Sequence, residues 1–414
     1  MVYNPRTSRG GHDTSAAALS HCATDTGGQM IRRTRSRKGA RSQVATLTLA
    51  GLTLLLSTAR VLAVPAYSFP RPDIDDSPRH YICHRTTGPI TADGQLDEAA
   101  WVAAPWTDAF VDIEGDRKPA PRFKTRAKML WDDDYFYIAA EMEEPHVWAK
   151  LVERDAVIFY DNDFEVFIDP DSDTHEYYEL EVNAFATEWD LLLTKPYRDG
   201  GTAIDSWDIQ GLRTGIDVRG TLNDPSDTDE GWNVELAIPW SVLEECAHKP
   251  APPEDGDQWR VNFSRVEWRT EVVEGDYAKI TNPETGKPLP EDNWVWSPQG
   301  LINMHYPEMW GFVQFSTTVA GEAEVAFVPD REHGTRWTLF DVYYAERTYH
   351  GSNGVYTGDL STLDIKMPRR TARVWPPSIT VTPSMFEAHL GAMDGGTLHI
   401  SNDGHVWHVP PADP

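Results

Sequence analysis

Residues 163–169 have the sequence Asp-Phe-Glu-Val-Phe-Ile-Asp, in which apolar and charged side chains alternate as they do along a β-strand. Similar alternating segments occur at 232–238 and 259–263, and each is bounded by Asp, Gly, Pro or Asn. The segment 123–140 contains two strand-like runs separated by three consecutive aspartates, which is the pattern of a hairpin. Many short strands with turns between them over 81–315, and little helix, predict a mainly β fold, an antiparallel β-sandwich.

The N-terminal region has the layout of a secretory signal. A basic stretch at 32–41 precedes an apolar run at 44–56. The run is too short to span a bilayer comfortably, and the small residues at 61–63 offer a cleavage site after Ala63, with Ala66 as an alternative. We therefore expect a protein that is secreted or lies in the periplasm or cell envelope, with no transmembrane segment in the mature chain.

The chain is expected to contain two folded parts. The predicted segments are a signal peptide region (1–63, with Met30 as an alternative start), a linker (64–78), the β-sandwich (79–316), a connector (317–335) and a small α+β domain (336–414). The small C-terminal α+β unit is predicted from a helical stretch at 337–349 and from strands at 378–382 and 396–400. This order of elements is similar to the head of type IV pilin-like proteins. The alternative is a structural appendage that packs on the sandwich.

The chain is strongly acidic, with 65 Asp and Glu against 37 Lys and Arg and a formal net charge of −28. Loss of residues 1–63 removes nine basic and two acidic residues, so the mature chain would carry about −35. We therefore expect no nucleic-acid partner, because phosphate backbones are recognised by positive charge. Neutral glycans and divalent cations are compatible with this charge.

Two cysteines, Cys83 and Cys246, follow the predicted cleavage site. They can form at most one disulfide, which an oxidising compartment would permit. The alternative is a pair of buried unpaired thiols. The spacing along the chain does not decide between these two possibilities.

Five motifs occur in a fixed order along the predicted sandwich. They are Asp-Gly-Gln-Leu-Asp at 93–97 with Trp101, Leu-Trp-Asp-Asp-Asp-Tyr-Phe-Tyr at 130–137, the strand at 163–169, Gly-Trp-Asn-Val-Glu at 231–235 with Ile-Pro-Trp at 238–240, and Trp-Val-Trp-Ser-Pro at 294–298. Together they resemble the family 9 carbohydrate-binding modules, within the DOMON-like β-sandwich superfamily, and are closest to secreted family 9-like proteins. The resemblance implies a β-sandwich with structural calcium.

Modules of this family hold the end of a glycan between two aromatic rings while polar side chains bind its hydroxyls. By resemblance, the first ring position falls on Phe159, and a hydroxyl-binding carboxylate falls on Glu165. A family arginine falls on Glu181, and the second ring position falls near Met304. Because of these departures, the xylan or cellulose specificity of the family is not transferred to this chain.

The segment 157–163 also indicates a sugar site from its own residues, since two large aromatic side chains stand beside three polar ones on an expected loop. A flat ring suits the apolar face of a pyranose, and carboxylates and amides bind its hydroxyls. The alternative is that Phe159 or Tyr160 closes the end of the sandwich. The complete predicted carbohydrate-binding set is Phe159, Tyr160, Asp161, Asn162, Glu165, Asn183, Trp207, Met304, His305 and Tyr306. Five other tryptophans are expected in the core: Trp101, Trp131, Trp232, Trp240 and Trp259.

Calcium is the expected cofactor. Asp169, Asp171 and Asp173 alternate as carboxylates do in calcium loops, because a hard cation needs several oxygens from a short segment. The loop lacks the glycine and the terminal glutamate of an EF-hand. Asp93 and Asp97 are further ligands implied by the resemblance. Ordinary turns are the alternative interpretation for all five residues.

Other chemistries find less support in the sequence. The 14 histidines are spread singly along the chain, and we expect no zinc enzyme. The pairs Glu141/Glu143 and Glu179/Glu181 could imitate the two carboxylates of a glycosidase, but acidic residues are so frequent that chance explains them. No Gly-x-Ser-x-Gly elbow or Gly-rich phosphate loop is found.

The leading hypothesis is a secreted, calcium-stabilised and non-catalytic carbohydrate-binding protein, an accessory in polysaccharide recognition or degradation with a poly- or oligosaccharide partner. One alternative is a haem-binding electron-transfer domain of the same superfamily, with Met129, Met304 and His305 as axial ligands. Others are a carbohydrate-active enzyme that uses the acidic residues around Glu165, and a structural envelope protein.

Overall fold

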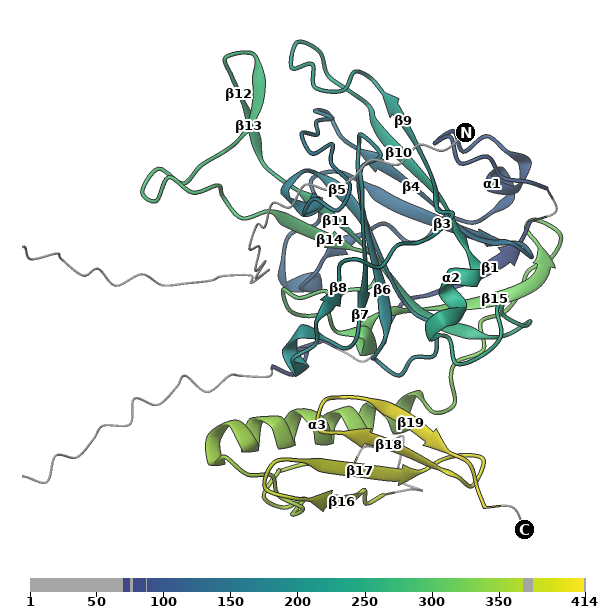
Figure 1. Cartoon of the computed structure of the whole chain (residues 1–414), viewed down its shortest axis with the longest axis vertical. Coiled ribbons are helices and arrows are strands. Elements are labelled where there is room, and N and C mark those ends of the chain that lie inside the picture. The colour runs from purple at the N-terminus through teal and green to yellow at the C-terminus, as the bar shows by residue number, and fades with distance from the viewer. Residues whose placement is uncertain (1–69, 75–76, 87, 368–374, 413–414) are drawn as a thin grey trace, which may run out of the picture. The chain divides into compact units, whose positions relative to one another are not determined.

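The computed structural model of the protein describes residues 70–74, 77–86, 88–367 and 375–412 (Figure 1). The predicted signal peptide region, and the start of the predicted linker, lie outside these residues. All of the described residues belong to one compact unit. Within the described part of the chain, no helix is both long and apolar enough to cross a membrane.

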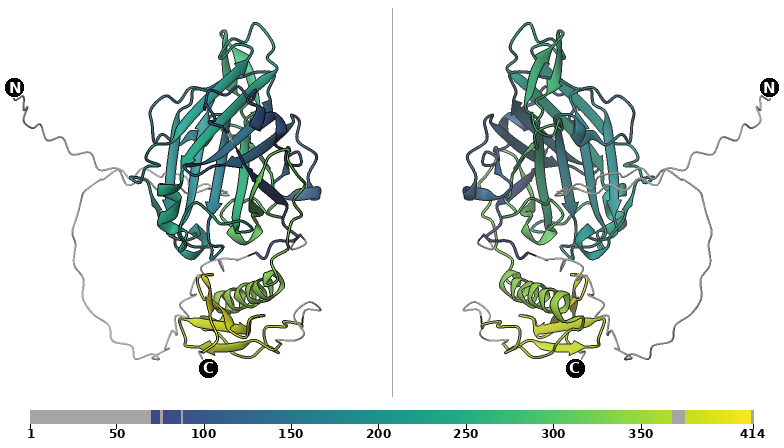
Figure 2. Two further views of the ribbon diagram at one scale, coloured as in Figure 1. Left: turned by 90° about the vertical axis from the view of Figure 1, so that its right-hand side faces the viewer. Right: turned by 90° about the vertical axis from the view of Figure 1, so that its left-hand side faces the viewer.

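The sandwich consists of one continuous sheet whose two halves face each other across a common core (Figure 2). In spatial order, the first half contains β8 (Ala203–Ile204), β7 (Glu188–Leu193), β6 (Tyr177–Asn183), β5 (Asp163–Asp169), β11 (Gln258–Glu267) and β15 (Gly311–Val319). The second half contains β3 (Thr125–Trp131), β4 (Tyr135–Glu143), β10 (Gly231–Pro239) and β9 (Arg213–Arg219). Strand β14 (Asp292–Val295) pairs with β11 and with the short β2 (Val111–Asp112).

Strand β1 (His80–Arg85) joins the two halves. It pairs with β15 along its length and with β3 at His84 and Arg85, and both pairings are parallel. The other pairings of the sandwich are antiparallel. The predicted mainly β sandwich is therefore confirmed, with β1 as the parallel exception.

The alternation of side chains along each strand separates an inner from an outer face. On β5, Phe164, Val166 and Ile168 are at most 1% exposed and lie in the main core, where they belong to the same apolar cluster as Ile138 of β4. Because successive side chains of a strand point to opposite faces, the remaining residues of β5 lie on the outer face. The five tryptophans expected in the core are all at most 4% exposed: Trp101, Trp131, Trp232, Trp240 and Trp259.

Cys83 and Cys246 are both buried unpaired thiols in this main core. Burial raises the pKa of the Cys246 thiol to about 11 and that of the Cys83 thiol well above its usual value. Of the two possibilities left by the sequence, the structure has the pair of unbridged cysteines.

The C-terminal unit consists of one helix lying against a four-stranded antiparallel sheet (Figure 1). The helix is α3 (His333–Asn353), and the strands are β16 (Ser378–Val381), β17 (Phe386–Gly391), β18 (Thr397–Ser401) and β19 (Val406–Val409). The predicted helix at 337–349 is confirmed and extends further at both ends. Apolar residues of the helix, among them Phe340, share a core with Leu390 and Ile400 of the sheet. Gly354 ends the helix in the left-handed conformation, with φ of 73°, as glycine does without strain.

A buried ion pair ties α3 to the sandwich. Arg198, on the short helix η3 (Tyr197–Asp199), lies 2.9 Å from Glu308 on η5 (Pro307–Met309), and both side chains are at most 5% exposed. Tyr344 of α3 donates a hydrogen bond to Glu308. Buried charges of this kind are stable only when paired, so each partner depends on the other.

Candidate functional site

Buried carboxylates gather on the outer face of β5 and β6. Glu165 is the cross-strand neighbour of Glu181, while Asp163 and Glu179 stand opposite Asn183 and Phe167 on the same face. Oxygens of Asp163, Glu165 and Glu181 lie within 4.8 Å of one another. All four carboxylates are at most 6% exposed. We call Asp163, Glu165, Glu179 and Glu181 the carboxylate group.

Burial raises the pKa of every carboxyl in this group. The pKa of Glu165 rises from 4.5 to about 7, chiefly because burial disfavours the charged form. The pKa values of Asp163, Glu179 and Glu181 rise well above their usual range, first through burial and then through the charges of neighbouring carboxylates.

Two oxygens of the carboxylate group, Oδ2 of Asp163 and Oε2 of Glu179, are buried without a hydrogen-bond partner among the described residues. A buried polar atom that makes no hydrogen bond costs about 1–3 kcal/mol. The carboxylate group is therefore suited to a ligand that offers hydroxyls or positive charge.

Aromatic rings border the carboxylate group on one side. Phe159, on η2 (Ile158–Tyr160), is partly buried, and its ring centroid lies 4.8 Å from that of Tyr160 and 6.5 Å from that of Trp189. Tyr160 is 55% exposed, so its ring is open to solvent. The backbone N–H of Phe159 donates a 2.9 Å hydrogen bond to Glu181, which fixes the aromatic segment beside the carboxylates.

A second aromatic border comes from Tyr197 and His305, whose ring centroids are 4.5 Å apart. Tyr197 is 39% exposed, and the charges of Glu179 and Glu181 contribute to its raised pKa after burial. The hydroxyl of Tyr177 lies 2.8 Å from Nδ1 of His305. Burial, and then the charge of Arg198, lower the pKa of His305 to about 3, so this imidazole is neutral at physiological pH. Met304 is 7% exposed and lies in the apolar cluster of this outer face.

The hairpin of β12 (Thr270–Val273) and β13 (Asp276–Lys279) places the ammonium group of Lys279 beside the ring of Tyr160. Nζ of Lys279 lies 3.4 Å from the ring centroid of Trp268 and 5.6 Å from that of Tyr160. Burial lowers the pKa of Lys279 to about 8, although the nearby acids Asp161, Glu291 and Asp163 oppose that change. The indole N–H of Trp268 donates to the carbonyl of Phe159 at 2.8 Å, which links hairpin and loop.

Three of the predicted sugar contacts instead hold the loop together. Asp161 accepts hydrogen bonds from the backbone of Lys150 and Leu151 and from the amide of Asn183. Asn183 also accepts from two backbone N–H groups. Asn162 donates to two buried glutamates and accepts from the backbone of Trp268. Because the amide groups of Asn162 and Asn183 and Oδ2 of Asp161 already bond to other parts of the chain, we leave these three residues out of the candidate site.

Two further predicted contacts lie elsewhere. Trp207 stacks on Tyr178 of the main core at 5.1 Å and donates to Glu245. Tyr306 is 2% exposed and stacks on Tyr344 of α3, with the guanidinium of Arg198 4.0 Å above its ring. Both rings support the fold and are not part of the candidate site.

The residues proposed as haem ligands are divided between two clusters. Met129 is fully buried in the main core, whereas Met304 belongs to the apolar cluster of the outer face. His305 also packs on the outer face and bonds to Tyr177 through Nδ1. The described structure therefore does not assemble Met129 with the other two residues as an axial pair.

The carboxylates predicted as calcium ligands bond to backbone N–H groups and lie beside histidines. Both carboxylate oxygens of Asp169 accept backbone N–H groups, from Ser172 and from Thr174. Asp93 accepts the N–H of Gln95, and neither it nor Asp97 belongs to a group of three metal-binding side chains among the described residues. Asp171 and Asp173 lie beside histidines, so that their neighbours offer nitrogen as well as oxygen: His175, His248 and His405.

The structure adds residues that the predicted set omits. The sequence alone explains the pair Glu179 and Glu181 by chance, and it gives no signal for Tyr197 and Lys279. A signal for the two glutamates exists in the sequence, because they alternate with Leu180 and Val182 on the strand that follows β5. That alternation alone predicts solvent-facing carboxylates, and their burial arises from the surrounding loops.

Solved structures with similarity to this chain include a family 9 carbohydrate-binding module from Caldicellulosiruptor kristjanssonii, determined with cellotriose and with glucose. The cellotriose complex is 16% identical, with a TM-score of 0.37, and the match covers 61% of this chain and all of that one. The glucose complex is 14% identical, with a TM-score of 0.37, over 60% of this chain and all of that one.

Sequence comparison with known proteins gives two matches. A curated relative, exoglucanase XynX of Acetivibrio thermocellus, is 28% identical over 120 residues, which are 28% of this chain and 9% of that enzyme. The chain thus spans only about a tenth of the length of this relative. Residues 92–254 match the model of the family described as carbohydrate family 9 binding domain-like. The chain therefore contains a domain like the family 9 carbohydrate-binding modules.

Proposed function

We propose that this protein binds a poly- or oligosaccharide, without cleaving it, on the outer face of β5 and β6. The observation that carries this proposal is the carboxylate group, which has unpartnered oxygens on Asp163 and Glu179. The aromatic segment with Tyr160 is bonded to Glu181 through the backbone of Phe159, and Tyr197 lies close enough for the charges of Glu179 and Glu181 to act on it. The family match of residues 92–254 supports a carbohydrate as the ligand class.

The chemistry of the proposed contacts suits a sugar. Below about pH 7 the carboxyl of Glu165 is protonated, so it can donate one hydrogen bond and accept others, as a sugar hydroxyl also does. The exposed rings of Tyr160 and Tyr197 offer flat apolar surfaces for the C–H face of a pyranose. Lys279 adds a donor over the Tyr160 ring, 5.6 Å from its centroid.

Binding is favoured over glycoside cleavage by the electrostatics of the carboxylate group. A glycosidase needs one protonated acid and one ionised carboxylate, whose environments push their pKa values apart. Here burial raises the pKa of Glu165, Glu179 and Glu181 together. Because all three pKa values shift upward, they give no sign of one protonated and one ionised carboxyl, and this supports binding over cleavage.

We also propose that calcium, where it is bound, is held by Asp163, Glu165 and Glu181. These three side chains offer only oxygen donors within 4.8 Å of one another, which is the donor chemistry that calcium prefers. A bound ion would supply positive charge to the buried carboxylates. Calorimetric titration of the chelator-treated protein with calcium, compared with its Glu165→Gln variant, tests this, and equal binding by both proteins would exclude these ligands.

We further propose that the protein acts outside the cytoplasm as an accessory in polysaccharide recognition or degradation. The basic, apolar and small-residue segments between 32 and 63 support export. Mass determination of the protein isolated from its natural source tests this part. A mature N-terminus near Val64 is expected, and a chain that keeps residues 1–63 would contradict export by cleavage.

Isothermal titration of the purified protein against glucose and against cello-, xylo- and manno-oligosaccharides tests the binding proposal. We expect a dissociation constant between micromolar and millimolar for at least one glycan, or about 4–8 kcal/mol of binding free energy. The variants Glu181→Gln and Tyr160→Ala should each weaken that binding at least about tenfold, whereas Glu271→Gln, on exposed β12, should not change it. A panel without any binder, or unchanged binding by both site variants, would overturn the proposal.

A further inference from the structure

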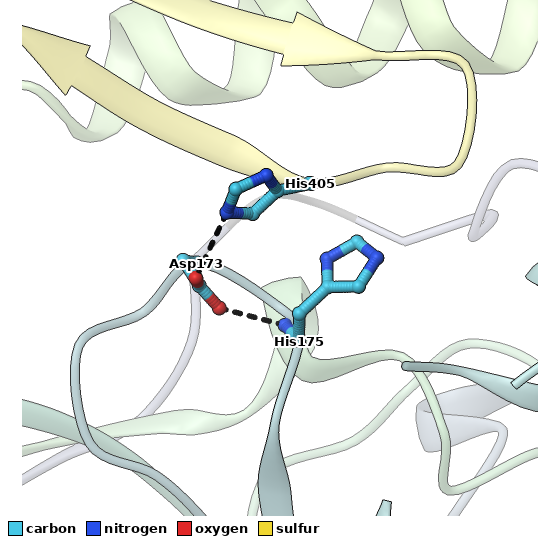
Figure 3. Close-up of side chains that lie close together, drawn as sticks. All are labelled: Asp173, His175 and His405. Atoms are coloured by element: carbon cyan, nitrogen blue, oxygen red, sulfur yellow. Dashed lines mark hydrogen bonds and ion pairs between the residues drawn. The ribbon is translucent and has the colours of Figure 1, made fainter. Parts of the chain in front are cut away.

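The loop between β5 and β6 and the loop between β18 and β19 bring together Asp173, His175 and His405 (Figure 3). Nε2 of His405 lies 3.0 Å from Oδ2 of Asp173, and the two imidazole rings meet edge to face with their centroids 4.8 Å apart. Each of the three residues offers one ligand atom within 4.8 Å of the others. The three ligand atoms are thus close enough to coordinate one ion.

Backbone contacts hold the two loops in register. The N–H of Val406 donates to the carbonyl of Asp173 at 3.0 Å, and the hydroxyl of Thr174 donates to the carbonyl of Gly404 at 2.7 Å. The N–H of His175 donates to Oδ1 of Asp173 at 2.7 Å, which leaves Oδ2 directed toward His405 (Figure 3). The arrangement is therefore fixed by the main chain on both sides and does not depend on long flexible side chains.

The imidazole of His175 is buried without a hydrogen bond. Its side chain is 12% exposed, and neither Nδ1 nor Nε2 has a hydrogen-bond partner among the described residues. Oδ2 of Asp403 lies 3.8 Å from Nε2, beyond hydrogen-bond distance, and is already bonded to Lys195 at 3.0 Å. An imidazole nitrogen that lacks a partner in the interior is costly, and coordination to a metal ion would satisfy it.

We propose that Asp173, His175 and His405 bind a divalent transition metal ion of the zinc type. Two imidazole nitrogens with one carboxylate oxygen suit zinc, nickel or copper, whereas calcium takes oxygen donors. Three protein ligands leave one position of a tetrahedral ion for water or for another ligand. Since His405 belongs to the C-terminal sheet and Asp173 to the sandwich, the ion would link these two parts of the chain.

A second group, Glu387, His389 and His399, provides a comparison within the same molecule. Both ring nitrogens of His399 already have partners, because Nδ1 lies 2.8 Å from Glu387 and Nε2 lies 2.7 Å from the hydroxyl of Thr397. A metal ion there would displace a contact of His399, just as an ion bound by Asp173, His175 and His405 would replace the contact between Asp173 and His405. The difference is that His175 has buried nitrogens without a hydrogen bond. This group therefore supplies the control variant His389→Ala.

The test uses the full chain without an affinity tag, treated with a chelator and returned to metal-free buffer at pH 7.5. Zinc is titrated in competition with a chromophoric chelator, and cobalt(II) is added separately because its visible spectrum reports coordination by protein nitrogen. We expect one zinc ion per chain. The variants His175→Ala and His405→Ala should each weaken binding by more than about 100-fold, since even partners that only orient metal ligands contribute 10–100-fold. His389→Ala should bind as the wild type does.

Folding of each variant is checked by circular dichroism, and thermal unfolding supplies a second measurement. Zinc should raise the melting temperature of the wild type and of His389→Ala but not that of His405→Ala, because an ion that binds only the folded state stabilises it. Absence of stoichiometric binding, loss of binding in His389→Ala, or full binding by folded His175→Ala and His405→Ala would each overturn the proposal.

Discussion

Replacement of Glu165 by glutamine should change how the stability of the protein depends on pH. Glu165 is 6% exposed and lies within 4.8 Å of two other carboxylates, Asp163 and Glu181. Its pKa is about 7 in the folded protein against a usual value of 4.5. The folded state therefore binds this proton more tightly than the unfolded chain does.

The sign of the effect follows from proton linkage. Stability falls with rising pH wherever the folded state holds more protons than the unfolded state. For Glu165 that window runs from about pH 4.5 to about pH 7, so its contribution is full below the window and lost above it. Each unit of difference between the two pKa values is worth about 1.4 kcal/mol, which gives about 3 kcal/mol of destabilisation at pH 8.

Glutamine has nearly the same shape and no charge at any pH, so the variant lacks this loss. Urea unfolding followed by tryptophan fluorescence, with a chelator present and at constant ionic strength, measures both proteins at pH 5, 6, 7 and 8. The free energy of unfolding of Glu165→Gln, relative to the wild type, should increase by about 2–3 kcal/mol between pH 5 and pH 8. Glu143→Gln, at the exposed end of β4, serves as the control and should show no such increase. Parallel pH profiles for Glu165→Gln and the wild type would refute the argument that burial of this carboxyl is unfavourable.

Three further predictions concern the fold. Arg198→Ala should lower the free energy of unfolding by about 3–5 kcal/mol in urea titrations, because it leaves Glu308 buried and unpaired, and a loss below about 1 kcal/mol would argue against a buried pair. Phe164→Ala should cost about 3–5 kcal/mol in the same assay, since it opens a cavity in the main core, whereas exposed Val272→Ala should cost less than about 1 kcal/mol. Iodoacetamide should not label Cys83 and Cys246 in the folded protein, because both thiols are buried, but it should label both after denaturation in the absence of reductant. Mass spectrometry measures the labelling, and cysteines that stay unlabelled in the denatured protein would indicate a disulfide.

The strands of the sandwich could be predicted because the apolar residues of each strand alternate with outward-facing residues within its own sequence. Phe164 and Val166 alternate with outward residues, and that local period of two survives in the structure as the boundary between core and outer face. The parallel pairing of β1 could not be predicted in the same way. His80 to His84 carry no signal that chooses β15 as a partner, since the partner follows from the closure of the whole sheet.

From the residues alone, the candidate site was predicted in one short segment, whereas Met304 and His305 entered through the family resemblance. Phe159, Tyr160 and Glu165 lie within seven residues of one another, so one segment could indicate them together. Asp161 and Asn162 also have side chains suited to sugar hydroxyls. In the structure, however, Asp161 accepts a hydrogen bond from the backbone of Lys150, and Asn162 donates to two buried glutamates. The sequence does not show these internal bonds. The residue type alone does not state whether a polar atom faces a ligand or another part of the chain.

The two proposed ion sites can be tested independently because they differ in both position and donor chemistry. Asp163 and Glu165 lie at the start of β5, whereas Asp173 follows its end, and six residues of strand already span about 20 Å. The first group offers oxygen donors only, while the second combines one carboxylate with His175 and His405. Calcium should therefore be lost on Glu165→Gln and unaffected by His405→Ala, and zinc should show the reverse pattern. A single variant that abolished both ions would mean that the two groups do not act as separate sites.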